Sequence, residues 1–246
     1  MTKHNRLESP KIDRSWMAAD NVALVIVDMQ NDFMPGGRLS VERGDEIVPL
    51  INQLRDNFKT IIMTQDWHPP GHISFAGSHE NKDPFDTIKV SYGDQVLWPE
   101  HCVQGSRGAQ FHPGLKRKKS DLLIRKGTNP QIDSYSAFFE NDGKTRPRFS
   151  YGDTFVQRIQ KLGIDTLVFV GLAGDYCVAW NALDAKKAAA DLTSVFVEDL
   201  TRAISQATLQ EKKQMMRKSG VIITGSDQLR SVLPLVENSS NKPKLA

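Results

Sequence analysis

The sequence predicts an α/β fold, a doubly wound and mostly parallel sheet of about six strands with helices on both faces. Continuous apolar runs rich in β-branched residues alternate with segments that have helical periodicity. Such runs are typical of parallel strands buried on both faces, and strand–helix alternation favours a parallel sheet. Because the sequence contains no repeat and no linker, we expect residues 1–246 to form a single domain.

The first half of the chain supplies two of these strands and one helix. Residues 22–28 and 60–66 are apolar runs of the kind that forms buried strands. Between them, residues 44–58 place Ile47, Leu50, Ile51, Leu54 and Phe58 at helical spacing, which predicts a helix. Pro49 fits only its first turn, because proline lacks the N–H that later turns require.

A long irregular stretch, residues 67–118, follows the second strand. It is rich in Pro, Gly, His and aromatic residues, and irregular stretches of this length are usually functional. We expect a polar arm over residues 1–20 and a disordered tail over 236–246. The remaining expected strands are 121–127, 166–172, 193–199 and 221–226, and the remaining expected helices lie near 152–162, 176–190 and 205–218.

Composition excludes several classes of function. The formal net charge is +3, and the short basic run 115–120 is typical of a solvated loop, so we expect no nucleic-acid partner. No apolar stretch approaches the roughly 18–20 residues that span a membrane, so we expect no membrane partner. The polar N-terminus and the presence of only two cysteines, Cys102 and Cys177, predict a cytoplasmic location.

Four of the expected strands lead to a reactive side chain. They end at Asp28, Asp66 and Lys126, and the fourth continues through a short turn to Cys177. The carboxyl ends of parallel strands share one edge of the sheet, where ligands bind in such folds. The sequence therefore predicts that two acids, a base and a thiol converge on one crevice.

Cys177 is the candidate nucleophile. It follows a tight glycine-containing turn, and a helix is expected to begin within a residue or two, so backbone N–H groups and the positive helix end favour the thiolate. Asp175 is placed to cap that helix. A buried structural cysteine is the alternative, and we expect Cys102, which sits in a loop with no helix start after it, to be structural or incidental.

Asp28 and Lys126 support the nucleophile in this interpretation. A carboxylate near a thiol can accept its proton and later deliver it to a departing amine. A lysine beside both groups keeps the carboxylate ionised. Separately, Asp28 would more often cap a loop and Lys126 would more often be a solvated charge, so their shared edge position is what favours a catalytic role.

A metal site is predicted next to these residues. Asp66 and His68 can point to one side of an extended chain, and His72 and His101 follow in the long loop. Two histidines and a carboxylate commonly bind zinc, iron or manganese with positions left open. A loop whose histidines only form hydrogen bonds is the alternative. The residues alone leave open whether such an ion would activate water, which would make Cys177 unnecessary, or orient a substrate.

Several segments closely resemble nicotinamidases, also called pyrazinamidases, within the isochorismatase-like cysteine hydrolases. They are VIVDMQNDFMPGG, TQDWHPPGHISF, WPEHCVQGS, the RKG around Lys126, DSYSAFF and GLAGDYCV, spread over about residues 22–226. The resemblance implies hydrolysis of nicotinamide, and of pyrazinamide, through a thioester on Cys177, with Asp28 and Lys126 completing a triad. It also implies one divalent metal ion, zinc before iron or manganese, on Asp66, His68 and His101.

The resemblance implies further site residues. His72 is implied as a fourth ligand or as a partner of metal-bound water. The backbone of Ala173 and Cys177 is implied to form an oxyanion hole, with a cis peptide bond before Ala173. The implied aromatic walls of the substrate pocket are Phe33, Trp98, Tyr135 and Tyr176. Two departures from the family pattern are Gly174, where threonine is common, and a longer connection over residues 141–152.

Two other functions stay open on the sequence. One is a hydrolase that uses metal-bound water on another small aromatic or carbamoyl amide. The other is a ligand-binding member of the fold without catalysis, although such a protein would be expected to lose triad residues that this chain retains. The sequence leaves self-association into a homo-oligomer open as well.

Overall fold

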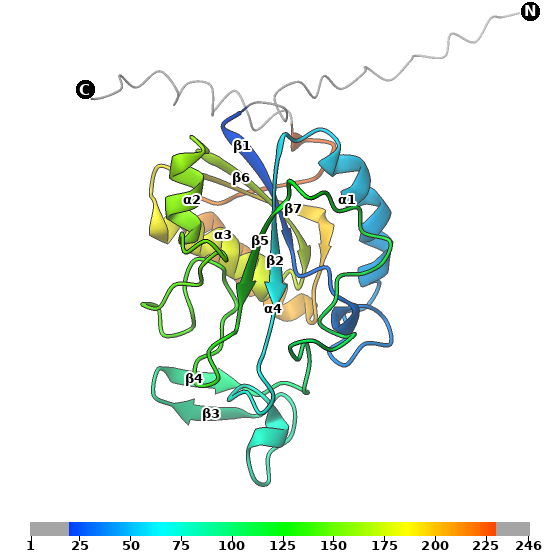
Figure 1. Cartoon of the computed structure of the whole chain (residues 1–246), viewed down its shortest axis with the longest axis vertical. Helices are drawn as coiled ribbons and strands as arrows, with labels where there is room; N and C mark the ends of the chain where they lie inside the picture. The colour runs from blue at the N-terminus through cyan, green and yellow to red at the C-terminus, as the bar shows by residue number, and fades with distance from the viewer. Residues whose placement is uncertain (1–19, 230–246) are drawn as a thin grey trace, which may run out of the picture.

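The computed structural model describes residues 20–229, and it contains the predicted parallel sheet (Figure 1). Its strand order is β5-β2-β1-β6-β7-β8, and every neighbouring pair is parallel. The expected arm and tail lie outside the described residues, apart from Asp20. The strands are β1 (Val22–Val27), β2 (Thr60–Asp66), β5 (Leu122–Lys126), β6 (Thr166–Leu172), β7 (Thr193–Arg202) and β8 (Ile222–Thr224).

Helices cover both faces of the sheet, unevenly. Helix α1 packs in one hydrophobic core, and the other three helices pack in the second core on the opposite face. Strand β1 explains the continuous apolar runs, because Leu24 and Ile26 enter the first core while Val25 and Val27 enter the second. The helices are α1 (Ile47–Arg55), α2 (Phe155–Lys161), α3 (Cys177–Ala188) and α4 (Gln206–Lys218), with short 3-10 turns η2 (Asn31–Phe33), η3 (Gly44–Glu46) and η4 (Ala76–Ser78).

The predicted helix over 44–58 is shorter than expected. Its first residues form the 3-10 turn η3, which follows Arg43 in a left-handed conformation, and α1 ends at Arg55. Leu50 does not belong to the buried stripe, because 42% of it remains exposed, whereas Ile47 and Ile51 are fully buried. The helical spacing was therefore correct, but the apolar face is narrower than the pattern indicated.

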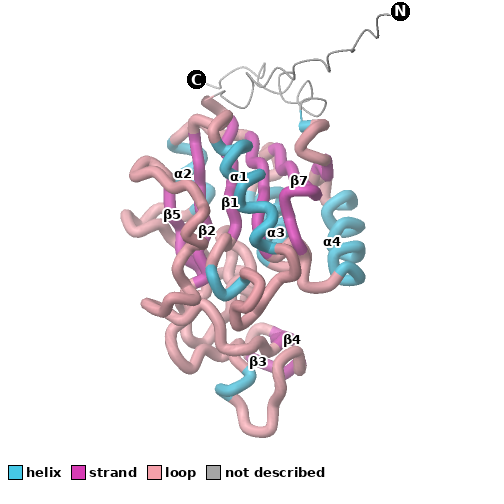
Figure 2. The backbone as a smooth tube through the Cα atoms, turned by 90° about the vertical axis from the view of Figure 1, so that its right-hand side faces the viewer, coloured by secondary structure: helices cyan, strands magenta, loops and turns pink. Residues whose placement is uncertain are grey.

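An antiparallel hairpin inside residues 67–118 was not predicted. It consists of β3 (Thr87–Val90) and β4 (Gly93–Val96), and it projects beyond the carboxyl ends of the strands (Figure 2). Its sequence TIKV does alternate polar and apolar residues, but only over four positions, and every one of them is exposed or half-buried, so the pattern is too short to stand out. The rest of the stretch is folded back over the same edge of the sheet, where it walls the candidate site.

The strand order places a topological switch point between β1 and β6. From β1 the chain moves outward through β2 and β5, and it then returns to β6 and moves the other way through β7 and β8. Open parallel sheets bind ligands outside the carboxyl ends of the strands at such a point. Asp28 and Ala173 follow the two strands that flank it. Among the described helices, none is both long enough and apolar enough to cross a membrane.

Candidate active site

The four residues predicted at the strand ends do lie together. Lys126 is their centre, with its Nζ atom 3.0 Å from Asp28 Oδ2 and 3.0 Å from Asp66 Oδ1. The same Nζ donates hydrogen bonds to the Ser134 carbonyl oxygen at 3.0 Å and to Cys177 Sγ at 3.4 Å. Lys126 is 1% exposed, so this ammonium group is solvated almost entirely by protein.

The charges on these groups depend on one another. Burial opposes the charge on Lys126, but Asp28 and Asp66 outweigh it and raise the lysine pKa well above its usual value. Burial raises the pKa of Asp28, and the Lys126 ammonium only partly offsets this. Asp28 is therefore a carboxylate that accepts a proton more readily than an exposed aspartate, as a general base requires.

Thr64, which the sequence reasoning missed, holds the Asp28 carboxylate in place. Its hydroxyl donates to Asp28 Oδ1 at 2.6 Å and accepts from the Asp28 backbone N–H at 3.2 Å. Asp28 has a left-handed backbone with φ 46°, and Thr64 holds both its backbone N–H and its carboxylate. Asp28 Oδ2 is buried and, within residues 20–229, makes an ion pair with Lys126 but receives no hydrogen bond. Oδ2 is therefore the oxygen with capacity to accept a proton.

The state of the Cys177 thiol corrects one expectation. Burial raises its pKa well above the usual value, and Asp28 and Asp66 raise it further while Lys126 lowers it. The predicted contribution of the helix start does not decide the resting state, because burial and two carboxylates outweigh the favourable charges. Cys177 therefore rests as a thiol and needs Asp28 to remove its proton.

Asp175 does not cap helix α3. The residue before the helix is Tyr176, which makes no side-chain cap. The Asp175 carboxylate instead accepts hydrogen bonds from the backbone N–H groups of Ile204 and Ser205 at 3.0 and 2.9 Å. It thereby fastens the nucleophile turn to the turn between β7 and α4, which sequence spacing could not reveal.

The backbone before Cys177 has the arrangement that the family resemblance implied. The peptide bond between Leu172 and Ala173 is cis. The Ala173 carbonyl oxygen accepts from the N–H groups of Tyr176 and Val178, at 3.1 and 3.0 Å. Within residues 20–229 the N–H groups of Ala173 and Cys177 donate to no protein acceptor. Two free amide donors beside the thiol are what an oxyanion hole requires.

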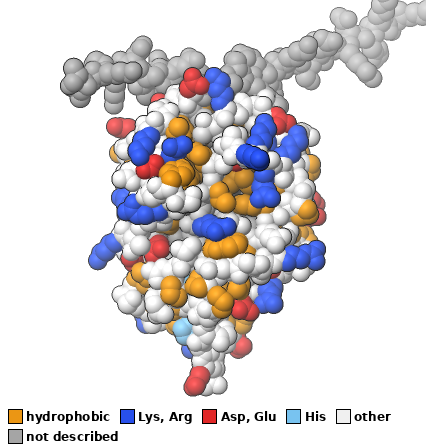
Figure 3. Space-filling model, viewed as in Figure 1, with side chains coloured by type: hydrophobic (Ala, Val, Ile, Leu, Met, Phe, Trp, Pro, Cys, Tyr) orange, Lys and Arg blue, Asp and Glu red, His pale blue; other side chains and the backbone are white. Residues whose placement is uncertain are grey.

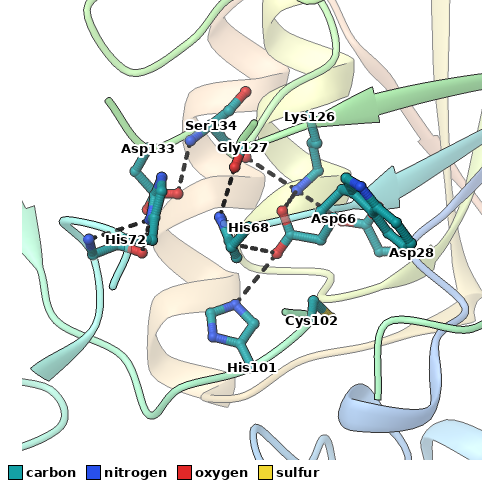
Figure 4. Close-up of polar contacts among 12 residues, drawn as sticks. Asp28, Asp66, His68, His72, His101, Cys102, Lys126, Gly127, Asp133 and Ser134 are labelled. Atoms are coloured by element: carbon teal, nitrogen blue, oxygen red, sulfur yellow. Dashed lines mark hydrogen bonds and ion pairs between the residues drawn. The ribbon is translucent and has the colours of Figure 1, made fainter. Parts of the chain in front are cut away.

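A second cluster, shown in Figure 4, has the geometry of a metal site. Asp66 Oδ2 lies 3.0 Å from His68 Nε2 and 3.3 Å from His101 Nε2. The opposite ring nitrogens donate to carbonyl oxygens, His68 Nδ1 to Gly127 at 3.0 Å and His101 Nδ1 to Pro99 at 2.8 Å. This hydrogen bonding fixes the tautomer in which Nε2 is free to bind a metal.

The protonation of this cluster also suits a cation. The charges of His68 and Lys126 overcome burial and hold the pKa of Asp66 well below its usual value. Burial lowers the pKa of His68, but the Asp66 carboxylate outweighs it, so the net shift is upward. A metal ion bound by His68 would take the place of that proton.

His72 lies on the other side of His68, at a centroid distance of 4.2 Å. Its Nδ1 pairs with Ser74 Oγ at 2.7 Å, and its buried Nε2 has no hydrogen-bond partner within residues 20–229. Burial, with His68 nearby, lowers its pKa to about 4, so the ring is neutral at pH 7. His68, His72 and Asp133 form a second group of potential ligands, and Asp133 was missed as a candidate ligand, although it begins the DSYSAFF segment that carries part of the family resemblance.

Cys177 and the cluster of Asp66, His68 and His101 line a single small cavity, whereas Asp28, Lys126 and His72 are not among its lining residues. All four predicted aromatic residues belong to its surroundings. Trp98 meets Tyr176 edge to face at a centroid distance of 4.8 Å, and Tyr135 meets Tyr176 at 5.4 Å. The lining residues are Phe33, Leu39, Asp66, His68, Trp98, His101, Asp133, Ser134, Tyr135, Ala173, Tyr176, Cys177 and Ile204.

Cys102 lies outside this cavity, as its structural assignment predicted. It is fully buried, and its N–H donates to Asp32 Oδ2 at 2.7 Å. Its carbonyl oxygen accepts from the His68 N–H at 3.0 Å, so it supports the loop that carries two of the candidate ligands. Burial raises the pKa of its thiol well above the usual value, as for Cys177, but within residues 20–229 Cys102 lacks the hydrogen bond from a lysine ammonium that Cys177 receives.

Comparison with known proteins agrees with this geometry. The isochorismatase domain family matches residues 22–228. The chain belongs to the isochorismatase family. Among curated relatives of this isochorismatase-family protein, the nicotinamidase of Acinetobacter baylyi is 50% identical over 204 residues, which are 82% of this chain and 92% of the relative.

Solved structures of the same family superpose closely. A nicotinamidase pyrazinamidase from Acinetobacter baumanii has a TM-score of 0.80 and 46% identity, covering 86% of this chain and 99% of the other. The pyrazinamidase of Pyrococcus horikoshii, solved in complex with zinc, has a TM-score of 0.67 and 30% identity, covering 83% and 99%. The predicted isochorismatase-like fold is thereby confirmed.

Proposed function

We propose that this isochorismatase-family chain is a nicotinamidase, which hydrolyses nicotinamide to nicotinate and ammonia and accepts pyrazinamide as well. The observation that carries the proposal is one small aromatic-walled cavity that contains both Cys177 and the Asp66, His68 and His101 cluster. A flat pyridine ring fits such walls, and a carboxamide on it can reach the thiol while the ring faces the cluster. The nicotinamidase relative with 50% identity supports the same substrate.

The reaction begins with the resting thiol. Asp28 Oδ2 accepts the proton of Cys177, and the sulfur attacks the carboxamide carbon. The carbonyl oxygen becomes an oxyanion, for which the free N–H groups of Ala173 and Cys177 are the donors. Lys126 stabilises the thiolate and the carboxylate throughout, because its ammonium contacts both residues.

The second half of the reaction returns every group to its starting state. Asp28, now protonated, gives its proton to the amide nitrogen of the substrate. The C–N bond then breaks, ammonia departs, and a thioester remains on Cys177. A water molecule then attacks the thioester carbon while Asp28 accepts one of its protons. Collapse of this intermediate releases nicotinate, and the proton held by Asp28 returns to the sulfur.

We infer that Asp66, His68 and His101 hold one divalent metal ion, with His72 as a further ligand or as the partner of a water bound there. The buried and unpartnered Nε2 of His72 and the fixed tautomers of the other two histidines support this assignment. When bound, the ion supplies a Lewis acid suited to a pyridine nitrogen. Zinc fits imidazole and carboxylate donors, as do iron and manganese, and the zinc complex of the Pyrococcus horikoshii relative favours zinc.

Replacing the nucleophile tests the mechanism. Cys177→Ala should release no ammonia from nicotinamide while keeping its fold and its metal content. Cys102→Ala is the matched control, because it removes the other buried thiol and should retain turnover. Mass spectrometry of acid-quenched wild-type enzyme should show a nicotinoyl adduct on Cys177.

The competing function is a hydrolase that uses metal-bound water on another small aromatic or carbamoyl amide. Substantial turnover by Cys177→Ala would favour it, as would ammonia release from other amides with none from nicotinamide. The hydrogen bond from Lys126 to Cys177 Sγ argues for the cysteine, because it gives the sulfur a buried cationic partner that a structural thiol does not need.

We also propose that residues 20–229 act as one domain and that the protein works in the cytoplasm. Strands from both halves of the chain alternate in one sheet, which supports the first proposal. Both cysteines are free and buried, which supports a reducing compartment. Limited proteolysis and cell fractionation test the two statements, and sedimentation of the purified protein tests self-association.

A further inference from the structure

A basic hollow lies beside the edge strand β5, separate from the catalytic cavity. It measures roughly 580 Å³ and shares no lining residue with that cavity. Basic side chains are interspersed with apolar ones on this face of the molecule (Figure 3). The residues that line the hollow are Leu123, Arg125, Thr128, Glu140, Arg146, Pro147, Arg148 and Ser150.

The three arginines of the hollow have no acidic partners. Within residues 20–229, the arginines that form ion pairs all lie elsewhere in the fold, and Arg125, Arg146 and Arg148 form none. Surface arginines usually meet a carboxylate or remain fully solvated. Three unpaired guanidinium groups around one hollow therefore create a local positive potential that the small net charge of the chain conceals.

Each guanidinium group is nevertheless held in place. Arg125 lies over the Trp67 ring, 4.0 Å from its centroid, and Arg146 lies over the Phe139 ring at 4.4 Å. Arg148 Nη1 donates to the Gly152 carbonyl oxygen at 2.8 Å. Arg125 Nε also donates to Gln65 Oε1 at 3.1 Å, so its two terminal amino groups are the part that a ligand can reach. Stacking on a ring fixes the plane of a guanidinium group, so less entropy is lost on binding.

The chemistry around the arginines selects the ligand. Planar guanidinium groups bind phosphate oxygens with two parallel hydrogen bonds, and the hydroxyls of Thr128 and Ser150 can add further donors. Glu140 is the one acidic residue among the described residues that line the hollow, and its negative charge would oppose the binding of an anion. Burial and nearby Asp142 raise its pKa to about 7, so it carries only part of a negative charge near neutral pH.

We propose that this hollow binds an oligophosphate, either free or as the phosphate chain of a nucleotide. Arg146 and Arg148 belong to the connection over residues 141–152. This connection reaches β5 through a bridge between Phe149 and Ile124, and it thereby brings its arginines to Arg125. The site does not depend on the proposed amidase activity.

Calorimetric titration of the full-length, metal-loaded protein with pyrophosphate, and separately with ATP, tests the proposal at constant ionic strength. We expect saturable binding of one pyrophosphate per chain. The double variant Arg146→Gln/Arg148→Gln should weaken it at least 10-fold, and Glu140→Gln should strengthen it. If ATP binds more tightly than pyrophosphate, the ligand is a nucleotide; equal affinity indicates a free oligophosphate.

The matched control is Arg107→Gln/Arg217→Gln, which removes the same charge from two exposed arginines elsewhere. This control should bind as the wild type does, and all variants should keep their ammonia release. Equal weakening in the control would show general charge attraction and overturn the proposal. Unchanged binding in the double variant would place pyrophosphate at the metal centre and overturn the proposal. Absence of binding to the wild type would overturn it as well. Arg125→Gln alone provides a second reading if the double variant fails to fold.

Discussion

Thr64→Val offers a direct test of how the general base is held. The substitution keeps the shape of the side chain and removes the hydroxyl that donates to Asp28 Oδ1 at 2.6 Å. A hydrogen bond to a charged group contributes about 1.5–3 kcal/mol. One pKa unit corresponds to about 1.4 kcal/mol, so the loss should raise the pKa of Asp28 by about 1–2 units.

The direction of the effect on activity depends on which protonation state of Asp28 is active in catalysis. Catalysis needs the ionised carboxylate, and burial has already raised its pKa. Removing a donor that stabilises this ionised form raises the pKa again. The acid limb of kcat/KM for nicotinamide should therefore move to higher pH by about 1–2 units, while KM at the alkaline plateau stays close to the wild-type value.

Two measurements separate positioning of the base from general damage. The rate of ammonia release, measured across the acid pH range, gives the acid limb of the kcat/KM profile. The rate at which iodoacetamide alkylates Cys177 reports activation of the thiol in the absence of substrate. Thr64→Ser keeps the hydroxyl and should restore both values. An unmoved acid limb in Thr64→Val, or an equal shift in Thr64→Ser, would refute the reasoning. Thr64→Val should also unfold at lower temperature, because the Asp28 N–H loses its acceptor.

Three further predictions concern the surroundings of the site. Gly127→Ala should lose bound metal and activity, because a Cβ at residue 127 would lie 2.4 Å from His68 Cε1. Gly105→Ala is the control: Gly105 has a similar left-handed φ, but a Cβ there would meet no atom within 4 Å, so this variant should keep its metal and its activity. Treatment with a chelator should stop ammonia release yet still allow iodoacetamide to alkylate Cys177. If the chelator also prevented alkylation, the metal ion and the thiol would not have separate roles. Asp175→Ala should lower the free energy of unfolding by about 1–3 kcal/mol, measured by denaturant titration, because it frees two backbone N–H groups.

The strand-end residues could be predicted because parallel strands obey one simple rule. Each buried strand has a distinctive apolar run, and the carboxyl ends of such strands must share an edge. Asp28, Asp66 and Lys126 were therefore located in space without knowledge of the strand order. The order itself, which puts β1 beside β6, depends on pairing between distant segments and leaves no local mark in the sequence.

Residues that act through distant partners could not be predicted in the same way. Thr64 looks like an ordinary β-branched residue of a strand, and only the register of β1 against β2 brings its hydroxyl to Asp28. Asp175 has a suitable type and spacing for a helix cap, but its carboxylate instead accepts from the backbone N–H groups of Ile204 and Ser205, in a turn that is distant in the sequence. Ser134 contributes a backbone carbonyl oxygen, which residue identity does not reveal.

Lys126 makes the triad and the metal cluster one electrostatic unit. Its single positive charge lies 3.0 Å from each of two buried carboxylates, Asp28 and Asp66, so these three groups together leave one negative charge uncompensated. Buried charge without a partner is costly, and the Asp66 carboxylate raises the pKa of His68, which favours a protonated ring as the source of the missing positive charge. A divalent ion on the same ligands would supply it instead. The proposed ligand set would thereby also help to keep Asp28 ionised, although none of its members belongs to the proposed triad.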